Sequence, residues 1–489
     1  MCHGDSDDSH YPFNWLEAEA VEGMRPVVAN FGFLLQINGL LLILPIAIGL
    51  HNAELQAVAS IMATCFTSFG VGFVLNSYCE RKELDGTTSL WFMLVTFIVL
   101  PLVLMIPYVW NNVFNSGNPF DLLTDAYFET VSGFTTTGFT FITHPEALPA
   151  SLLFYRSLVE FIGGIGFVYL LVAFLYPNRS LDSFAEAFGV ERLGDDLKRL
   201  FVYIMLVYSV FVVVFTILFY FVYSPDVVVA SCAAIDILTG GYAINVTGGI
   251  GIFQVSLVGL MLLGSLNFAF HYNLFRRRPH IALTREIRLY LWIIVGATVL
   301  FSILAWVNPW DSLFHVVSMI SSTGTDYIRV AGTPIAARIL IIVIMLIGGC
   351  TFSMAGGIRI QRVQLLIDVL RRKSDPLDKK QLREVLTSIV CFLAVLLALS
   401  LVFSTIGISL LDSIFEVGSA LTTNGNSVGI TTAAMPFFYK WLLIFAMNLG
   451  RIEILAAFKA LSSTPVFDMA KRLAGRLGEE AKRRLSRSE

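Results

Sequence analysis

The sequence predicts an all-α polytopic membrane protein in which an N-terminal helix hairpin precedes four copies of one helical unit. The prediction rests on composition, on the spacing of apolar runs and on a recurring 14-residue pattern. Of the 489 residues, 56% are hydrophobic and 14% are charged, and the mean hydropathy is +0.75. Soluble domains are far more polar, so most of the chain needs a hydrocarbon environment.

Ten apolar runs are long enough to cross the membrane, since a span of about 30 Å takes about 20 helical residues. They cover residues 28–50, 57–77, 89–110, 151–176, 199–223, 250–275, 287–307, 336–370, 384–406 and 436–460. The polar, acidic first 27 residues lack the features of a signal peptide, so we expect the first span to be retained. An even number of crossings leaves both termini on one side.

Positive charge orients these spans. Alternate connections at 51–56, 111–150, 224–249, 308–335 and 407–435 contain only Arg329 as a lysine or arginine. The other connections and the C-terminal tail are rich in cations, with clusters at 81–82, 179–199, 276–288, 371–383 and 471–487. The positive-inside rule places the second set in the cytoplasm. We therefore expect a multi-pass protein of the cell inner (cytoplasmic) membrane with both termini cytoplasmic.

Four outer segments share an ungapped pattern. The windows are DAYFETVSGFTTTG (125–138), VVASCAAIDILTGG (228–241), DSLFHVVSMISSTG (311–324) and DSIFEVGSALTTNG (412–425). Aspartate, phenylalanine and serine recur at the first, fourth and eighth positions of three windows, and serine or threonine stands twelfth in all four; the second copy departs most. The chain then divides into residues 1–85 (cytoplasmic N-terminus and transmembrane hairpin), repeats at 86–198, 199–285 and 286–380, and a fourth repeat with a basic cytoplasmic tail at 381–489.

Each window joins a short helix to a polar end. Asp125, Asp311 and Asp412 are expected as helix N-caps. Extended backbone survives at membrane depth only where it lines a water-filled cavity or is buried in protein, and four such segments would direct carbonyl and hydroxyl oxygens at one line, as in a cation filter. We therefore expect a fourfold repeat of helix, pore loop and helix around a central pore.

The predicted filter consists of the last four residues of each window. These are Thr135, Thr136, Thr137 and Gly138; Leu238, Thr239, Gly240 and Gly241; Ser321, Ser322, Thr323 and Gly324; and Thr422, Thr423, Asn424 and Gly425. The final glycines can adopt the positive φ that turns a carbonyl onto the axis. The C-terminal ends of the short helices add partial negative charge.

Acidic residues accompany the filter. Glu129 and Glu416 share one repeat position, which His315 holds in the third copy. They would either concentrate cations at the outer mouth or hydrogen-bond the filter backbone from behind. With Asp125, Asp311 and Asp412 they form the predicted vestibule or pore-helix acids.

These windows and four further motifs resemble membrane subunits of the Trk/Ktr/HKT superfamily of potassium transporters over nearly the whole chain. The motifs are FYRSLVEFIGGIGF (154–167), GSLNFAFHY (264–272), GGCTFSMAGGIRIQR (348–362) and LGRIEI (449–454), and the leading hairpin is similar to the Trk branch. The resemblance implies potassium selectivity, because Gly138 holds the position at which sodium-favouring plant members have serine. The third and fourth filters continue as GTDY and GNSV, which leaves the degree of discrimination against sodium open.

A gate is expected within residues 336–370, which would measure about 52 Å as one helix. Its middle contains Gly348, Gly349, Gly356 and Gly357. A break there would place a loop below the third filter, whereas the alternative is that the glycines serve close helix packing. The resemblance implies a gating loop at these residues.

Arg451 is a cation in the last span, a position that indicates function. It would either belong to the gate or be neutralised by a carboxylate from another span, because Glu453 is too near in sequence to face it. The resemblance implies an arginine just below the filter.

The sequence favours potassium uptake, and the alternative is a symporter coupling K⁺ to Na⁺ or H⁺. An enzyme would need a nucleophile paired with a general base, or a set of metal ligands, and the sequence offers neither. The seven histidines and six cysteines show no metal-ligand spacing. We expect K⁺ ions in the filter, no organic cofactor, passage of Rb⁺ and Na⁺ as further candidates, and no nucleic-acid partner. The basic loop at 371–380 and the tail are either solvated charge or a docking surface. The resemblance implies a homodimer and a cytosolic nucleotide-binding regulatory ring. Any nucleotide control would come from another polypeptide, because this chain has no phosphate-binding glycine motif of its own.

Overall fold

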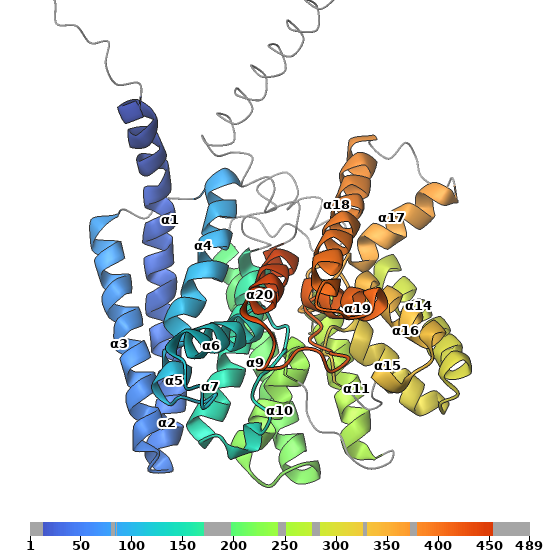
Figure 1. Ribbon diagram of the computed structural model, residues 1–489, viewed down its shortest axis with the longest axis horizontal. Helices are drawn as coiled ribbons and strands as arrows, with labels where there is room; N and C mark the ends of the chain where they lie inside the picture. Colours follow the sequence, from blue (N-terminus) through green and yellow to red (C-terminus); the bar gives the residue numbers. More distant parts are fainter. Residues whose placement is uncertain are drawn as a thin grey trace, which may run out of the picture.

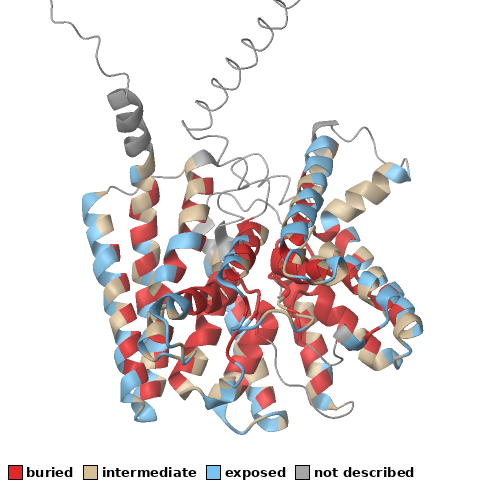
Figure 2. Cartoon of the chain, viewed as in Figure 1, coloured by how far each residue is buried: buried red, intermediate tan, exposed pale blue. Residues whose placement is uncertain are grey.

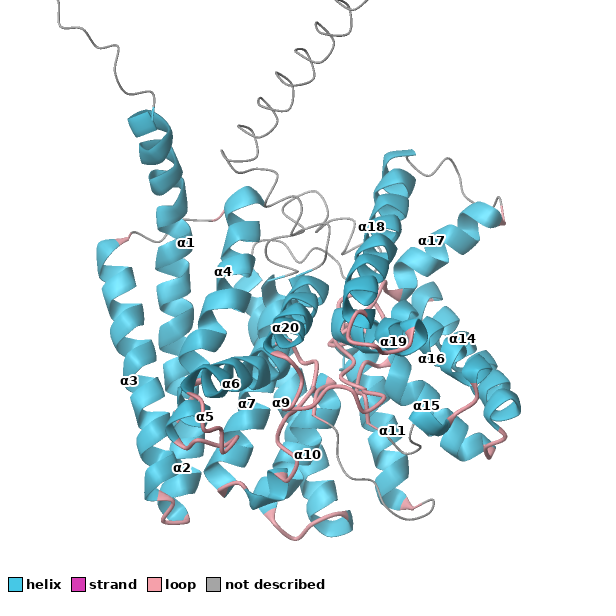
Figure 3. Ribbon diagram, viewed as in Figure 1, coloured by secondary structure: helices cyan, strands magenta, loops and turns pink. Residues whose placement is uncertain are grey.

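The computed structural model describes residues 13–79, 84, 86–170, 197–242, 251–275, 284–325, 330–371 and 379–452. Within these ranges all regular elements are helices and no strand occurs (Figure 3). The polar ends of the first, third and fourth windows are therefore loops rather than strands, and in the second window the helix continues to Thr239. The predicted all-α class is confirmed.

Six of the described helical stretches are long and apolar enough to cross a membrane. They are Met24–His51, Leu55–Tyr78, Thr88–Trp110, Val202–Val222, Arg285–Ala305 and Leu382–Ser404. Buried residues concentrate at the centre of the molecule, whereas the outer faces of the peripheral helices carry exposed side chains (Figure 2), many of them large and apolar. The chain is a multi-pass membrane protein. Most of the cation-rich segments that orient the prediction, including the C-terminal tail, lie outside the described residues.

The N-terminal hairpin lies at one edge of the molecule (Figure 1). It consists of α1 (Phe13–Leu41), α2 (Ile43–His51) and α3 (Leu55–Tyr78). Small residues let α1 and α3 approach closely, because a Cβ atom placed on Gly32 would lie 2.9 Å from the carbonyl oxygen of Gly72. Glu54, between α2 and α3, accepts hydrogen bonds from the backbone N–H groups of Ala150 (2.8 Å) and Ser151 (2.9 Å). The hairpin thus caps the helix that begins at Ala150.

The remaining helices recur in one order: a long helix, a short buried helix, a loop and a second helix. The helices are α4 (Gly86–Leu104) with α5 (Ile106–Trp110), α6 (Pro119–Phe134) and α7 (Ala150–Leu170); α9 (Leu197–Val222), α10 (Val227–Thr239), α11 (Ile252–Ser265) and α12 (Phe268–Phe275); α14 (Arg285–Ala305), α15 (Pro309–Ile320), α16 (Ile335–Ile347) and α17 (Ile360–Leu370); and α18 (Lys379–Ser404), α19 (Leu410–Leu421) and α20 (Phe437–Ile452). Two short 3₁₀ turns, Pro145–Ala147 and Val330–Gly332, lie in connections. The loops after α6 and α19 run into the centre of the molecule (Figure 3).

The short helices begin earlier than predicted. Their N-caps are Asn118, Asp226, Asn308 and Ser409, so the assignment of Asp125, Asp311 and Asp412 as N-caps is wrong. In α6 and α15 a proline at the first helical position, where its missing N–H costs nothing, moves the start upstream. Asp311 and Asp412 lie in the first turn, and Asp125 lies in the helix interior.

Two predicted spans are interrupted. The 250–275 run breaks at Asn267, whose side-chain oxygen accepts a hydrogen bond from the Phe270 N–H at 2.8 Å. The 336–370 run breaks between α16 and α17, where residues 348–357 form a loop that we call the central loop. The two breaks meet, because the Phe268 N–H donates to the Phe352 carbonyl at 3.2 Å.

Candidate functional site

The ends of the four windows meet in a closed ring, which we call the polar ring (residues 135–138, 238–241, 321–324 and 422–425). Each segment lies against the next along the chain, and the fourth lies against the first. The closest backbone approaches join Gly138 to Gly241, Gly240 to Ser322, Gly324 to Asn424, and Gly425 to Thr137. All sixteen predicted filter residues are therefore brought to one place, although they come from four separate parts of the chain.

Glycine is required at these approaches for two reasons. The φ angles are +86° at Gly138, +62° at Gly324 and +76° at Gly425, a region that L side chains rarely adopt. A Cβ atom would also lie 2.1, 2.0 and 1.8 Å, respectively, from the carbonyl oxygen of the neighbouring segment. Any side chain would push the ring apart.

The second segment departs from the other three. In the first, third and fourth, the twelfth window residue has a positive φ: +56° at Thr136, +59° at Ser322 and +50° at Thr423. In the second, α10 continues to Thr239 and the positive φ of +78° falls on Gly240. The fourfold pattern predicted from sequence is thus broken locally where the sequence had drifted most.

The hydroxyls of the polar ring differ in their partners. Thr135 and Thr137 bond each other (2.7 Å), as do Ser321 and Thr323 (2.8 Å). The hydroxyls of Thr136 and Thr423 are buried without a hydrogen-bond partner in the described part of the chain. That part also holds no cluster of three or more His, Cys, Asp or Glu residues able to bind a metal ion. The sixteen ring residues are uncharged, and their oxygen atoms are those of backbone carbonyls, hydroxyls and the Asn424 amide.

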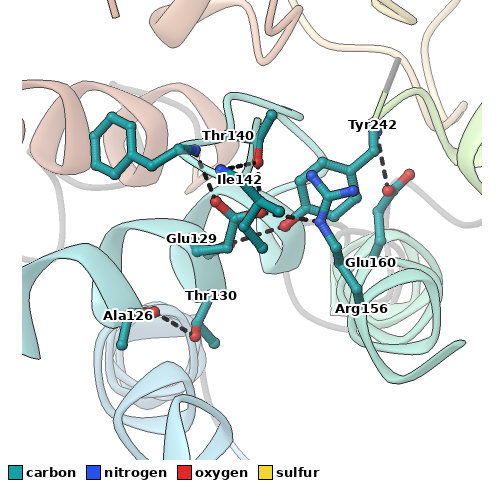
Figure 4. A network of polar contacts seen from close by, with 9 residues as sticks. Ala126, Glu129, Thr130, Thr140, Ile142, Arg156, Glu160 and Tyr242 are labelled. Carbon is teal, nitrogen blue, oxygen red and sulfur yellow. Dashed lines mark hydrogen bonds and ion pairs between the residues drawn. The ribbon is translucent and has the colours of Figure 1, made fainter. Parts of the chain in front are cut away.

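Buried glutamates hold the first and fourth segments from behind. Glu129 accepts hydrogen bonds from the Phe141 N–H (3.1 Å) and the Thr140 hydroxyl (2.9 Å) (Figure 4). Glu416 accepts from the Val428 N–H at 3.0 Å and the Thr431 hydroxyl at 2.9 Å. Both side chains are fully buried, so the geometry favours hydrogen bonding from behind the ring over a charged outer mouth. His315 is buried at the corresponding position of α15.

The second segment takes its glutamate from another repeat. Glu160, on α7, accepts hydrogen bonds from the Tyr242 N–H (3.1 Å) and from the Thr239 hydroxyl. Arg156 donates from Nε to Glu129 at 2.9 Å, and its guanidinium carbon lies 3.1 Å from the centre of the Tyr242 ring (Figure 4). The sequence prediction missed Arg156 and Glu160 as site residues. The available signal was two charges in an otherwise apolar span.

The predicted aspartates have separate partners. Asp125 forms a buried ion pair with Lys440 of α20 at 2.5 Å, and Asp412 pairs with Arg338 of α16 at 2.9 Å. Asp311 forms two hydrogen bonds with Asn308, the N-cap of α15: its N–H donates to the Asn308 side-chain oxygen, and its carboxylate accepts from the Asn308 amide nitrogen. None of the three lies in the polar ring; the pairs instead join helices from different repeats.

The central loop lies directly against the polar ring. The Gly356 N–H donates to the Ser322 hydroxyl at 3.1 Å, and a Cβ atom on Gly356 would lie 2.2 Å from the Thr422 carbonyl oxygen. The two ends of the loop, Gly348 and Gly357, have φ angles of +71° and +90° and pack against each other. These contacts and φ angles explain why three of the four predicted gate positions, Gly348, Gly356 and Gly357, are occupied by glycine.

Arg451 reaches the central loop from α20. Its Nη1 donates to the Met354 carbonyl at 2.9 Å, and its Nη2 donates to the Gly164 carbonyl of α7 at 3.4 Å. Arg451 thus bonds backbone oxygens of the loop and of the first repeat. A Cβ atom on Gly164 would lie 3.2 Å from both the Met354 sulfur and the Thr136 methyl group. The Met354 side chain of the central loop and Thr136 of the polar ring therefore both lie close to Gly164.

Comparison with known proteins identifies the family. The sequence model of the TrkH family, described as a cation transport protein, matches residues 96–293 and 289–462. The chain is 27% identical to an uncharacterized cation transporter of Methanocaldococcus jannaschii, over 90% of this chain and 95% of that protein. It is 26% identical to the Trk system potassium uptake protein TrkH of Halomonas elongata (91% and 99% covered) and 24% identical to that of Salmonella typhimurium (88% and 96%).

A solved structure shares the fold. The crystal structure of the potassium transporter TrkH from Vibrio parahaemolyticus superimposes with a TM-score of 0.76 at 21% identity, covering 91% of this chain and 99% of that chain. Together with the match to the family model over most of the sequence, this agreement leaves one conclusion: the chain belongs to the TrkH family of cation transport proteins.

Proposed function

We propose that the protein takes up potassium across the cytoplasmic membrane through the polar ring, which acts as a selectivity filter. The observation that carries the proposal is the closure of four glycine-containing segments into one ring of neutral oxygens. Carbonyl and hydroxyl oxygens replace the hydration shell of a monovalent cation. The names of the relatives, Trk system potassium uptake proteins, support potassium as the ion, and a transporter family agrees with the prediction that the chain is no enzyme.

Support for the filter comes from its buried braces. Glu129, Glu160 and Glu416 each bond a backbone N–H just beyond the ring. Such bonds orient the backbone beyond the ring, and Glu160 also accepts a hydrogen bond from the ring hydroxyl of Thr239. A filter built in this way would bind K⁺ or Rb⁺ weakly enough to release it, which conduction requires.

The central loop is proposed as the gate. It touches the ring at Ser322 and Thr422 and is bonded by Arg451, so an ion leaving the ring on this side would meet the loop and a positive charge. The predicted topology places both termini in the cytoplasm, and the side of the ring that carries the central loop then faces the cytoplasm as well. A cytosolic nucleotide-binding ring acting on a homodimer would then control the loop through the basic segments, most of which lie outside the described residues.

Ion flux into liposomes that contain the purified protein tests this function. At a fixed membrane potential we expect K⁺ and Rb⁺ to enter well above Na⁺ and to reverse with the potential. A variant lacking residues 352–355 would report on a closed gate, since it should conduct even if the intact chain alone does not. Flux that requires a sodium or proton gradient in both proteins would indicate coupled transport instead.

A further inference from the structure

The first turn of α14 carries two adjacent charged side chains that lie in different surroundings. The helix begins at Arg285, with the Thr284 hydroxyl accepting a hydrogen bond from the Ile287 N–H as its cap. The Glu286 residue is 7% exposed, whereas the Arg285 side chain is 65% exposed. A carboxylate buried at this depth needs hydrogen-bond donors.

The donors to Glu286 come from the two helix breaks. One carboxylate oxygen accepts a hydrogen bond from the Thr351 N–H in the central loop at 2.7 Å, and the other accepts from the Asn267 side chain at 3.4 Å. Hydrogen bonds to an ionised group are stronger than those between neutral groups. Glu286 therefore connects the central loop to the break between α11 and α12.

The far end of the central loop returns to the same place. Arg359, two residues after Gly357, has a φ of +78°, is 4% exposed and donates from Nη1 to the Cys350 carbonyl at 3.4 Å. The adjacent backbone groups of Cys350 and Thr351, at the start of the loop, are thus bonded by Arg359 and Glu286, respectively.

Arg285 acts on the helix that follows the loop. Its guanidinium lies 3.0 Å from the Asp368 carboxylate of α17. Consecutive residues of α14 therefore contact two consecutive parts of the chain: Glu286 contacts the central loop, and Arg285 contacts the helix after it. A movement of the start of α14 would shift both.

We infer that Glu286 is a positioning residue that holds the central loop against the polar ring, with the Arg285 and Asp368 pair as a second, weaker attachment. The inference deepens the proposed function, because it names the element of the fold, the first turn of α14, whose displacement would release the gate.

Cys350 supplies a readout of loop position that does not depend on ion flux. It lies in the central loop, is fully buried and is a free thiol. Replacing Cys2, Cys65, Cys79, Cys232 and Cys391 by alanine leaves it as the single cysteine. The rate at which membrane-permeant N-ethylmaleimide labels it in liposomes then measures how often the loop leaves its place.

Glu286→Gln keeps the size of the side chain but removes its charge, so we expect labelling of Cys350 and rubidium flux each to rise about tenfold, as for the loss of roughly 1.4 kcal/mol. Glu384→Gln is the matched control: Glu384 also follows an arginine near the start of its helix, α18, but is exposed, and its labelling rate should equal that of the parent.

The outcomes separate the inference from the proposed function. Faster labelling with unchanged flux would support the positioning role and overturn the loop as the gate. Equal labelling rates in Glu286→Gln, Glu384→Gln and the parent would overturn the positioning role, whatever the flux. Should Glu286→Gln not fold, Asp368→Asn tests the second attachment, where we expect about a twofold rise and where an unchanged rate contradicts the inference.

Discussion

Arg451 donates a hydrogen bond to the carbonyl oxygen of Met354 at 2.9 Å, which connects the last described helix to the central loop. A second bond from the same guanidinium reaches Gly164 on α7. One buried cation therefore bonds the loop between α16 and α17 together with helices of the first and fourth repeats. Its hydrogen bonds to backbone carbonyls hold the loop in place, and this arrangement leads to the first prediction.

Arg451→Gln should loosen the central loop. Hydrogen bonds from a charged group contribute about 1.5 to 3 kcal/mol, so losing the charge should raise rubidium flux by roughly tenfold or more. The measurement is tracer uptake into liposomes at matched protein density. Arg338→Gln, which removes a cation that pairs with Asp412 away from the loop, is the control, and equal flux in the two variants would argue against a role for Arg451 in the gate.

Gly138→Ser should lower selectivity for K⁺ over Na⁺ by about tenfold or more, because the new Cβ would lie 2.1 Å from the Gly241 carbonyl oxygen and strain of about 1 to 3 kcal/mol is expected at such a residue. Reversal potentials in mixed K⁺ and Na⁺ solutions measure the ratio. Gly407→Ser is matched for backbone, since its φ of +88° is nearly that of Gly138 (+86°) but nothing lies within 4 Å. Unchanged selectivity in Gly138→Ser would contradict the proposed role of Gly138 in the filter.

Breaking the buried pair of Asp125 and Lys440 should destabilise the protein. Removing one partner of a buried ion pair costs about 3 to 5 kcal/mol, whereas replacing both with apolar residues of similar size can be nearly neutral. We therefore expect Asp125→Leu and Lys440→Met each to lower the melting temperature in detergent. The double variant should recover most of the loss, and additive losses would show that the two residues do not act as a pair.

Glu160→Gln should alter the second segment of the ring while leaving the fold intact. The amide keeps one acceptor for the Tyr242 N–H but adds an N–H₂ donor near the Thr239 hydroxyl. We expect a change in the permeability ratio of Rb⁺ to K⁺ with little change in melting temperature. Gln254→Glu, a change on α11 outside the ring, serves as the comparison. A permeability ratio equal to that of the parent would assign Glu160 a purely structural role.

Local features of the sequence anticipate much of the fold. Hydropathy and the 14-residue windows identified a multi-pass helical protein and the segments that form the polar ring, because these signals depend only on neighbouring residues. The glycines of residues 348–357 likewise marked the place where α16 and α17 separate. The predicted starts of the short helices α6, α15 and α19 were wrong. The side chains of Asn118, Asn308 and Ser409 cap these helices upstream of the predicted aspartates, and in α6 and α15 a proline at the first helical position favours the same start.

The sequence by itself determined that the chain lies in a membrane and repeats four times, since apolar periodicity and recurring motifs are encoded along the chain. Only the tertiary structure decided which charges meet. Lys440 pairs with Asp125, 315 residues away, and Glu160 bonds Tyr242, 82 residues away in the next repeat. The physical reason is that a buried charge is stabilised by whichever partner the packing of helices brings within hydrogen-bond distance, and that packing joins residues with no periodic relation in the sequence.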